Sequence, residues 1–487
     1  MKYVLGIDFG GGASKATLMD KDGKIAAVSS KEYATLCVGG DGREQNPYDW
    51  YDATVYNIKN VILSSGVSGN DIECISFDAA THTAVLLDED FRPVRNSVYW
   101  TDTRSVKEKE YLSENFGDDI FRRFKHEADT VWTLPALLRI KNEEPLVWKK
   151  VRKITFAKDF VRHFFTGDFV TDYIEAEGSM FFDFDKMEWS EKYLNLLGID
   201  ESYLPRVVTP KTVVSAILPE TAKKLGINAE AKIICGTTDT AAEVFAAGAI
   251  KKGDATVKLA TAGRICVVSD KIVADKNLIN YSHVINGLYY PGTATKSCAA
   301  SLRWFRDSFG GDYKEFDEEA GKIPAGAEGL IFHPYLSGEL TPYGNPLLKG
   351  SFVGISGAHG KVHFIRAVLE GVAFSMLDCK KYLESKGIFI TSAFLIGGGA
   401  KSALWSQILA DALNVELTLT ENNDSSFGSA MLAGIAAGFF KDEKDALEKC
   451  SEISGKVYPN EENHKVYAEL FKKYKKIEKA LESVYCD

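Results

Sequence analysis

Short apolar runs separated by glycines open the chain. The runs "KYVLGID" (residues 2–8), "KATLMD" (15–20) and "KIAAVSSKEY" (24–33) are divided by a glycine segment and by "KDGK". Runs of this length with glycine turns between them predict a meander of three β-strands. Segment 46–66 has apolar residues at helical spacing and therefore predicts an α-helix. A further strand is predicted over residues 72–90, "IECISFDAATHTAVLLDED".

The second half of the chain repeats this arrangement in outline. A helix-like segment, 239–250, precedes "KGDATVKLATAGRICVVSD" (252–270), which again indicates a strand, a small-residue turn and a strand. Alternation of strands and helices is typical of α/β layers. Because 487 residues are too many for one hydrophobic core, we expect two related domains, 1–248 and 249–487.

The C-terminal segment 465–485 predicts an amphipathic helix. Its apolar side is formed by residues at helical spacing, namely Val466, Leu470, Tyr474, Ile477 and Leu481. Such a stripe normally packs on a core, so we expect this helix to lie on the second domain.

Charge and composition narrow the classes of protein. Lys plus Arg is 58 and Asp plus Glu is 68, and the resulting net charge of −10 argues against a nucleic-acid binder and against docking on anionic membranes. The first ten residues lack a signal-peptide core, and no apolar run has the roughly 18 residues of a membrane span. Eight scattered cysteines without a C-x-x-C pair predict reduced, mostly buried thiols and neither a zinc site nor a disulfide framework. We therefore expect a cytoplasmic protein.

The first candidate for chemistry is "DFGGGASK", between the first two predicted strands. Gly10–Gly12 admit close backbone approach, and their N–H groups can form a nest for an anion, to which Lys15 adds charge. Asp8 would repel a phosphate directly, so it implies a cation between them, most simply Mg²⁺. The alternative is a plain hairpin turn, because the segment is neither a Walker A loop nor G-x-G-x-x-G.

Two further small-residue segments lie in the second half. In "KLATAGRIC", Thr261 can supply a hydroxyl and Gly263 an open backbone, while Arg264 can bind a phosphate oxygen or form an ion pair. In "AFLIGGGAKSALW", a strand runs into Gly397–Gly399 and a helix follows, which suits a nucleotide. Three such segments in one chain are stronger evidence for a nucleotide site than one.

A carboxylate, Asp239, opens the helix-like segment of "KIICGTTDTAAEVFAAG". One interpretation is a helix N-cap, which Asp favours. The other is a base at the mouth of an interdomain cleft that accepts a hydroxyl proton. Phosphoryl transfer requires little more than such a base, a metal and backbone donors.

Together these segments resemble the FGGY family of carbohydrate kinases, over nearly the whole chain. The most specific piece, "GSFVGISGAHGKVHFIRAVLEG" (350–371), is similar to the family's C-terminal signature. The segments "PYLSGELTPYGNP", "VYWTDTR" and "AKDFVRHFFTGDFVTDYIEAEGSMFFDFDKMEW" resemble the xylulokinase branch. The segment "LIGGGAKSALWSQILADALN" resembles the family's adenosine-binding stretch.

The resemblance implies an α/β fold of two actin/Hsp70/hexokinase-like (ribonuclease H-like) domains, with ATP and sugar in the cleft between them. It implies that Asp239 is the catalytic base and that Asp8 and Asp239 lie near Mg²⁺. The residues implied in sugar binding are Thr81, His82, Trp100, Asp102, Asp239 and Thr240. The residues implied in ATP binding are Asp8, Gly10, Gly11, Gly12, Lys15, Thr261, Ala262, Gly263, Gly397, Gly398, Gly399, Ala400 and Ser402.

The sequence departs from the family pattern in both phosphate segments. Gly11 replaces a threonine, and Ala260–Ala262 replace G-T-S. The substrate stretch Q-M-H-G of xylulokinases is Ala80–Thr83 here, and "LPALLRI" has Ala136 and Arg139 where the N-terminal signature has Lys and Trp. We therefore expect altered handling of ATP, with Arg264 as a candidate replacement for lost phosphate contacts.

The expected activity is transfer of the γ-phosphoryl group of Mg-ATP to the terminal hydroxyl of a ketopentose, with xylulose first. Ribulose, fuculose, glycerol or another polyol are alternative acceptors. A sugar-binding regulator with a degraded phosphate site is the alternative outside enzymes. The expected partners are the sugar and ATP, without nucleic acid or membrane, and a homodimer is expected on general grounds only.

Overall fold

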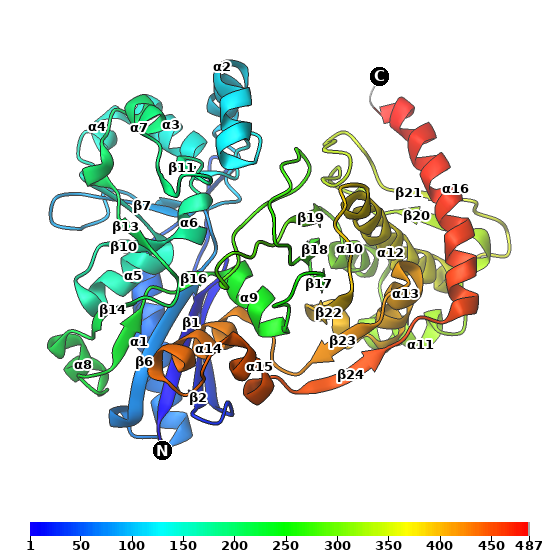
Figure 1. Ribbon diagram of the computed structural model, residues 1–487. Coiled ribbons are helices and arrows are strands. Elements are labelled where there is room, and N and C mark those ends of the chain that lie inside the picture. Colours follow the sequence, from blue (N-terminus) through cyan, green and yellow to red (C-terminus); the bar gives the residue numbers. More distant parts are fainter. Residues whose placement is uncertain (486–487) are drawn as a thin grey trace. The chain divides into compact units, whose positions relative to one another are not determined.

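The computed structural model describes residues 1–485, which form two compact units (Figure 1). The first unit comprises residues 1–246, 281–288 and 422–451, and the second comprises 247–280, 289–421 and the chain from 452 onward. Each unit contains a hydrophobic core of its own. The predicted division into functional domains at residue 248 remains a prediction.

A seven-stranded mixed sheet is the centre of the first unit. Its order is β14-β15-β6-β1-β2-β3, with β16 paired to β6. The strands β1, β2 and β3 are antiparallel, which confirms the predicted meander; β6 runs parallel to β1, β15 parallel to β6, and β14 antiparallel to β15. The strands are β1 (Tyr3–Phe9), β2 (Ala13–Asp20), β3 (Ile25–Glu32), β6 (Ile72–Ala79), β14 (Val213–Ala216), β15 (Lys232–Ile234) and β16 (Thr237–Thr238).

The second unit contains a six-stranded sheet of the same plan. Its order is β19-β18-β17-β22-β23-β24. An antiparallel meander of three strands is followed by two parallel strands and an antiparallel edge strand, as in the first unit. The related sheets explain the faint repeat in the sequence. The strands are β17 (Asp254–Leu259), β18 (Gly263–Val267), β19 (Gly292–Thr295), β22 (Ser392–Ile396), β23 (Leu417–Thr420) and β24 (Ile453–Val457).

Helices and small sheets complete each unit. The helices of the first unit are α1 (Pro47–Ser65), α2 (Val106–Phe124), α3 (Thr133–Glu143), α4 (Pro145–Trp148), α5 (Ala157–Thr166), α6 (Tyr173–Glu177), α7 (Glu191–Leu197), α8 (Pro219–Leu225), α9 (Asp239–Ala247, whose last residue falls in the second unit), α14 (Ser425–Ala437) and α15 (Glu443–Cys450). Those of the second unit are α10 (Ala299–Phe309), α11 (Tyr313–Ala320), α12 (Lys361–Ser385), α13 (Ala403–Leu413) and α16 (Glu461–Tyr485). The short strands are β4 (Leu36–Val38), β5 (Gly42–Gln45), β7 (Ala84–Leu87), β8 (Ser97–Val98), β9 (Lys153–Phe156), β10 (Val170–Asp172), β11 (Phe182–Asp183), β12 (Glu188–Trp189), β13 (Arg206–Val208), β20 (Ile331–His333) and β21 (Ser351–Val353). The 3₁₀ turns are η1 (Gly69–Asp71), η2 (Glu201–Tyr203), η3 (Ala327–Gly329) and η4 (Gly398–Lys401).

The predicted strand over residues 72–90 is wrong as a single element. The structure divides it into β6, which ends at Ala79, and β7, which begins at Ala84. Between them, His82 has a backbone φ of 70°. That left-handed conformation is incompatible with a continuous strand and is uncommon for a non-glycine residue.

The C-terminal helix α16 packs on the second unit, as predicted, but on a somewhat different face. Tyr467 and Tyr474 are buried, and Leu470 and Ile477 pack against the core. Val466 is 41% exposed, which corrects its assignment to the buried side.

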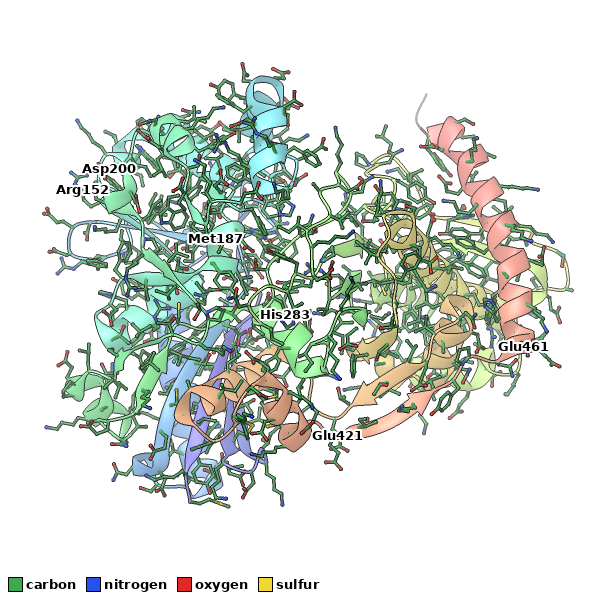
Figure 2. All side chains as sticks on the ribbon, viewed as in Figure 1. Arg152, Met187, Asp200, His283, Glu421 and Glu461 are labelled. Carbon is green, nitrogen blue, oxygen red and sulfur yellow. The ribbon has the colours of Figure 1, made fainter. Side chains whose placement is uncertain are left out.

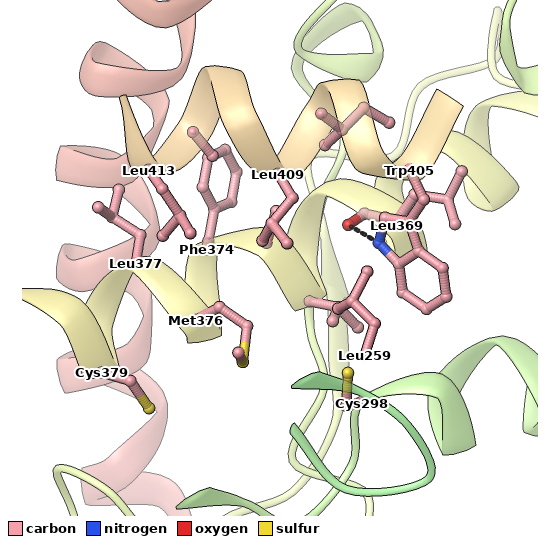
Figure 3. Packing of buried hydrophobic residues seen from close by; sticks show 14 of the residues in the cluster. Leu259, Cys298, Leu369, Phe374, Met376, Leu377, Cys379, Trp405, Leu409 and Leu413 are labelled. Atoms are coloured by element: carbon pink, nitrogen blue, oxygen red, sulfur yellow. Dashed lines mark hydrogen bonds between the residues drawn. The ribbon is translucent and has the colours of Figure 1, made fainter. Parts of the chain in front are cut away.

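Close packing in the second core joins α12 to α13 (Figure 3). Leu409 and Leu413 of α13 face Phe374 and Leu377 of α12 in this view. The indole N–H of Trp405 donates to the carbonyl oxygen of Leu369 at 3.1 Å. That bond satisfies the polar atom of a fully buried aromatic side chain.

Helix α14 lies against the first sheet through positions that only glycine permits. A Cβ at Gly6 of β1 would lie 2.0 Å from the carbonyl oxygen of Ser426, and one at Gly428 would lie 2.2 Å from that of Ala242 in α9. Backbone therefore meets backbone on both faces of α14. This contact places α14 between β1 and the helix that begins at Asp239.

The described part of the chain contains no helix long and apolar enough to cross a membrane. Of the cysteines within residues 1–485, Cys37 is exposed and the others are buried free thiols. Cys486 lies outside the described residues.

Candidate active site

The glycine loop between β1 and β2 is held by its carbonyl groups. The hydroxyl of Tyr33 donates to Gly10 O, and Thr35 Oγ1 and Gln45 Nε2 donate to Gly11 O at 2.6 and 3.0 Å. Within the turn, Gly10 N donates to Ala13 O at 3.0 Å. Presentation of N–H groups to an anion therefore remains a prediction, and it concerns Gly11 and Gly12.

Tyr99 explains the glycine at position 11. A Cβ at Gly11 would lie 2.9 Å from the Tyr99 hydroxyl oxygen. The side chain of a threonine there would collide with the Tyr99 hydroxyl group. Tyr99 is only 7% exposed, so the glycine that departs from the family pattern lies against a buried tyrosine. Tyr99 was not predicted as a site residue, although it lies in the quoted "VYWTDTR" segment.

Lys15 is paired within the first unit. Its ammonium lies 2.9 Å from Asp424 Oδ2, and Asp424 also caps α14 by accepting from Phe427 N. Both side chains of this ion pair are about one-third exposed. Asp424 was missed by the sequence reasoning, although an Asp before a small-residue helix is a recognisable cap signal.

A second carboxyl group lies beside Asp8. The parallel register of β1 and β6 pairs Asp8 with Asp78, and the Oδ1 atoms of both are buried without a hydrogen-bond partner among residues 1–485. Burial raises the pKa of Asp8 to about 7, and the negative charges of Asp239 and Asp424 add to that rise. Burial and the neighbouring Asp8 likewise raise the pKa of Asp78. Asp78 was not predicted, because strand register is a tertiary property.

Asp239 begins α9 but does not provide its cap. Thr238 Oγ1 accepts from Ala241 N at 3.3 Å, which is the usual capping contact. Asp239 Oδ1 accepts from the N–H and the hydroxyl of Thr240. The N-cap interpretation thus applies to Thr238, and the base role of Asp239 remains a prediction.

The loop before Asp239 is drawn against β6. Gly236 has φ 77°, and a Cβ there would lie 1.9 Å from the Phe77 carbonyl oxygen. Thr237 is then paired with Asp78 in parallel register. Local glycine conformation therefore brings the Asp239 loop next to the carboxyl groups of β1 and β6.

His82, predicted to contact the sugar, already has partners on its backbone and on both ring nitrogens. Its N–H donates to Glu175 Oε1 at 3.2 Å, Nδ1 lies 2.7 Å from Gly178 O, and Nε2 lies 2.8 Å from the Tyr281 hydroxyl. The ring of Trp132 meets it edge-on. Thr81 beside it is buried against Gly178.

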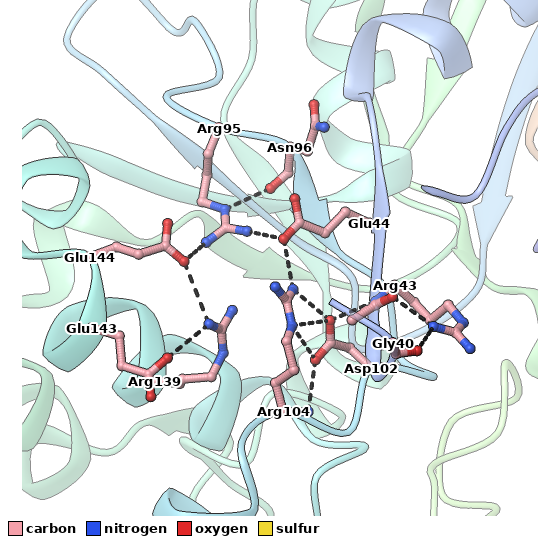
Figure 4. A network of polar contacts seen from close by, with 11 residues as sticks. Gly40, Arg43, Glu44, Arg95, Asn96, Asp102, Arg104, Arg139, Glu143 and Glu144 are labelled. Carbon is pink, nitrogen blue, oxygen red and sulfur yellow. Dashed lines mark hydrogen bonds and ion pairs between the residues drawn. The ribbon is translucent and has the colours of Figure 1, made fainter. Parts of the chain in front are cut away.

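Asp102 belongs to a network of arginines and carboxylates (Figure 4). Arg104 Nη2 donates to Asp102 Oδ2 at 2.6 Å and to Glu44 Oε1 at 2.7 Å, while Arg43 N donates to Asp102 Oδ2 at 2.8 Å. Burial alone would raise the pKa of Asp102, but the hydrogen bonds from Arg104 and Arg43 lower it. Arg104 N donates to the other oxygen, Asp102 Oδ1, at 3.0 Å, so both carboxylate oxygens are engaged. The predicted neighbour Trp100 is 43% exposed.

The predicted ATP residues of the second unit lie at the ends of β17 and β22. Thr261 Oγ1 accepts from Arg303 at 2.6 Å, and Gly263 N donates to Thr295 Oγ1 at 3.1 Å. Gly397, with φ 92°, approaches Leu259 so closely that a Cβ would lie 2.6 Å from its carbonyl oxygen. The two small-residue segments are therefore neighbours within this unit.

The adenosine-type segment borders a cavity of about 470 Å³. The lining includes Ala400, Lys401, Gln407 and Tyr458. Ser402 caps α13 by accepting from Trp405 N at 2.9 Å and donates to Asp317 at 2.8 Å. Ser402 therefore shapes the start of α13, and its predicted contact with ATP remains a prediction.

The two sheets of one plan define the class: an α/β protein of two actin-like domains. Residues 3–246 match the N-terminal domain, and residues 267–437 the C-terminal domain, of the FGGY family of carbohydrate kinases. The chain belongs to this family and is an ATP-dependent phosphotransferase acting on a carbohydrate. The resemblance seen in the sequence is confirmed.

Relatives with different named substrates match over the full length. The chain is 33% identical to a xylulose kinase of Bacillus subtilis, covering 98% of this chain and 97% of that protein. It is 28% identical to a gluconokinase of the same organism, covering 99% and 97%. The crystal structure of a ligand-bound xylulose kinase from Lactobacillus acidophilus superposes with a TM-score of 0.92, at 28% identity over 100% of this chain and 99% of that one.

Proposed function

We propose that the protein transfers the γ-phosphoryl group of ATP to the terminal hydroxyl of a ketopentose, most simply xylulose. The observation that carries this proposal is that Asp239, the first residue of α9, is not required as its N-cap, because Thr238 accepts the capping hydrogen bond from Ala241 N. The charge of Asp239 acts on the neighbouring Asp8. Full-length similarity to xylulose kinases at 28–33% identity supports the choice of acceptor.

The reaction assigns one step to the base. Asp239 accepts the proton of the sugar's terminal hydroxyl while the hydroxyl oxygen forms a bond to the γ-phosphorus. The bond between the γ-phosphorus and the β–γ bridging oxygen breaks, which releases ADP. The N–H groups of Gly11 and Gly12 and the ammonium of Lys15 are suited to the phosphate charge, whereas Gly10 N donates to Ala13 O. In this proposal the Lys15 ammonium leaves its ion pair with Asp424 when it binds the phosphates of ATP.

Magnesium fits the carboxyl groups of the first unit. Asp8 Oδ1 is a buried oxygen without a protein partner in the described chain, and oxygen is the ligand that Mg²⁺ prefers. Residues 1–485 hold no cluster of three or more metal-ligating side chains. That pattern suits an ion bound by one or two carboxylates and by substrate phosphates, with Asp8 and Asp239 as its protein residues. Bound there, Mg²⁺ supplies positive charge for the phosphates.

The acceptor has a second candidate. Similarity to gluconokinases supports gluconate, and the altered stretch Ala80–Thr83 keeps ribulose, fuculose and glycerol as further alternatives. A sugar-binding regulator without turnover is the remaining alternative. Against it stands the joint presence of Asp8, Lys15 and Asp239, which binding alone does not require.

We also propose a role for each domain and a cellular compartment for the protein. Residues 1–248 bind the sugar and carry the base, residues 249–487 bind adenosine, and the protein acts in the cytoplasm with sugar and ATP as its ligands. A homodimer is the oligomer that symmetry favours.

The test couples ADP release to NADH oxidation, with Mg-ATP and a panel of D- and L-ketopentoses, gluconate, fuculose, ribitol and glycerol. We expect turnover with one acceptor, and a loss of several orders of magnitude in kcat for Asp239→Asn with an unchanged fold by circular dichroism. Wild-type turnover by Asp239→Asn refutes the base. Silence across the panel, with a sugar still raising Tm, favours the regulator.

A further inference from the structure

The segment Tyr281–Leu288, called the strap here, packs in the first unit although the residues before and after it belong to the second. Its first four residues, Tyr281 to Val284, are buried, and His283 is labelled in Figure 2. A chain segment that leaves one compact unit and returns to it needs specific anchors, because its ordering costs conformational entropy.

The anchors are hydrogen bonds from α6 and its end. Glu177, which is fully buried, accepts from Ser282 N at 2.9 Å and from Ser282 Oγ at 2.5 Å. The hydroxyl of Tyr173 donates to His283 O at 2.8 Å. Burial raises the pKa of Glu177 to about 8, and the bonds from Ser282 oppose that rise. The carboxyl group and the strap therefore stabilise each other.

The anchored strap brings the Tyr281 hydroxyl to His82 Nε2, at 2.8 Å. On the other side of the ring, Nδ1 lies 2.7 Å from Gly178 O. A carbonyl oxygen only accepts, so Nδ1 carries the hydrogen, and in the neutral ring Nε2 accepts from Tyr281. Two fixed partners thus assign both the tautomer and the orientation of this imidazole.

We propose that Tyr281 is a positioning residue of the acceptor-sugar site, which holds His82 in its Nδ1–H tautomer, and that Glu177 and Ser282 keep Tyr281 in place. The strap thereby fixes the orientation of the ring, so that the sugar would meet His82 and Tyr281 as one hydrogen-bonded pair. The consequence for sugar affinity rests on the proposed function, whereas the tautomer does not.

The tautomer is tested by ¹⁵N NMR of the full-length protein labelled at histidine, with His82 assigned by loss of its signals in His82→Gln. We expect a protonated Nδ1 and an unprotonated, hydrogen-bonded Nε2 in the wild type. Tyr281→Phe removes the donor and should shift the Nε2 resonance to that of a nitrogen without a donor. A protonated Nε2 in the wild type overturns the proposal.

The functional effect is tested with the acceptor identified by the panel. Tyr281→Phe should raise the KM of the sugar about five- to tenfold, the effect of one lost hydrogen bond, while kcat and the KM of ATP stay within about twofold. Tyr193→Phe is the matched control, because it removes another hydroxyl bond of the first unit, from Tyr193 to Asp119 at 3.0 Å. An unchanged sugar KM in Tyr281→Phe overturns the proposal.

The role of Glu177 in anchoring the strap is tested by substitution. Glu177→Leu keeps the approximate volume but removes both acceptors, so sugar KM should rise as in Tyr281→Phe and the His82 spectrum should change in the same way. Glu177→Gln can accept from Ser282 N and donate to Ser282 Oγ, so it should recover most of the affinity that Glu177→Leu loses. Equal loss in both variants shows that Glu177 does not act through the strap.

The two proposals fail in different ways. If the wild type turns over no acceptor, the proposed function fails, while the NMR result still decides whether Tyr281 holds the tautomer, and calorimetry with the sugars of the panel decides whether it affects binding. If the wild type is active and Tyr281→Phe leaves both the spectrum and the sugar KM unchanged, only the strap proposal fails.

Discussion

At the scale of single residues, the glycine loop is adapted to its neighbour. The family pattern predicts a threonine at position 11, but a Cβ at this position would lie only 2.9 Å from the Tyr99 hydroxyl oxygen. Strand register also places the carboxyl group of Asp78 beside that of Asp8, on adjacent strands. The departure at Gly11 is thus accompanied by a nearby side chain, Tyr99, that motif comparison does not link to it.

Gly11→Ala tests this adaptation. Its Cβ would lie 2.9 Å from Tyr99 Oη, so we expect the loop to shift and the KM of ATP to rise several-fold. Tyr99→Phe in the same chain should restore the KM, because the nearest ring atom is then 3.6 Å away. Steady-state kinetics measure both variants.

Tyr99→Phe alone serves as the control, because it removes the hydroxyl oxygen without adding a Cβ to the loop. An ATP KM that stays raised in the Gly11→Ala, Tyr99→Phe double variant, while Tyr99→Phe alone is unchanged, contradicts a specific collision with the Tyr99 hydroxyl.

At the scale of elements, α14 and α9 are positioned by backbone contact. Gly428 of α14 lies against the Ala242 carbonyl of α9, so the helix that begins at Asp239 depends on a residue far along the chain. Helix α16 is held by a buried polar contact from β20. His333 Nε2 lies 3.1 Å from the carbonyl oxygen of Tyr474, and its Nδ1 lies 3.1 Å from Ser351 Oγ.

Gly428→Ala should move α9. The added Cβ would lie 2.2 Å from Ala242 O, so we expect a destabilisation of about 1–3 kcal/mol and a fall in kcat of tenfold or more, because Asp239 is displaced. Thermal unfolding and steady-state kinetics measure the two effects. Gly117→Ala in α2, with open space around its Cβ, is the control and should not lower Tm.

The pH dependence of stability should reflect His333. Burial lowers the pKa of His333 to about 4, below the roughly 6.5 of an unfolded chain. The unfolded state then binds a proton between these values and the folded state does not. Stability is therefore complete above about pH 6.5 and falls as the pH drops toward 4, by up to about 3 kcal/mol.

Denaturant unfolding at a series of pH values between 7 and 4.5 measures this dependence. His333→Phe keeps an aromatic ring against Tyr474 and cannot titrate, so it should be less stable at pH 7 but show a smaller decline toward acid. An identical decline in both proteins contradicts the assignment to His333.

At the scale of the whole molecule, the chain passes between its two compact units several times. Residues 422–451 return to the first unit, where Lys15, Thr17 and Asp78 contact α14 or its cap. The units are therefore not two independent consecutive segments, and a simple cut near residue 248 separates parts that pack together.

A fragment of residues 1–246 should consequently fail to fold cooperatively. It lacks α14, whose buried side chains Phe427 and Met431 complete the packing of the first unit. Near-ultraviolet circular dichroism during heating should show no sharp transition, and a fragment that adds residues 422–451 through a Gly/Ser linker should recover one. A sharp transition in the short fragment contradicts this expectation.

Much of the fold and part of the site could be predicted from the sequence. The meander, helix α1 and helix α16 followed from local periodicity, and the glycine segments and Asp239 were recognised because their residues are adjacent in the chain. The break at His82 could not be predicted, since its left-handed backbone occurs where the residue contacts Glu175, Gly178 and Tyr281, all remote in the chain.

The sequence by itself determined the class of protein, because strand and helix periods and motif spacings are local properties that survive at about 30% identity. Only the tertiary structure decided which carboxyl groups and hydroxyls meet. Asp78 lies beside Asp8 through strand register, Asp424 reaches Lys15 across 409 residues, and Tyr281 reaches His82 across 199. Contacts at such separations arise from packing, which no local pattern in the chain encodes.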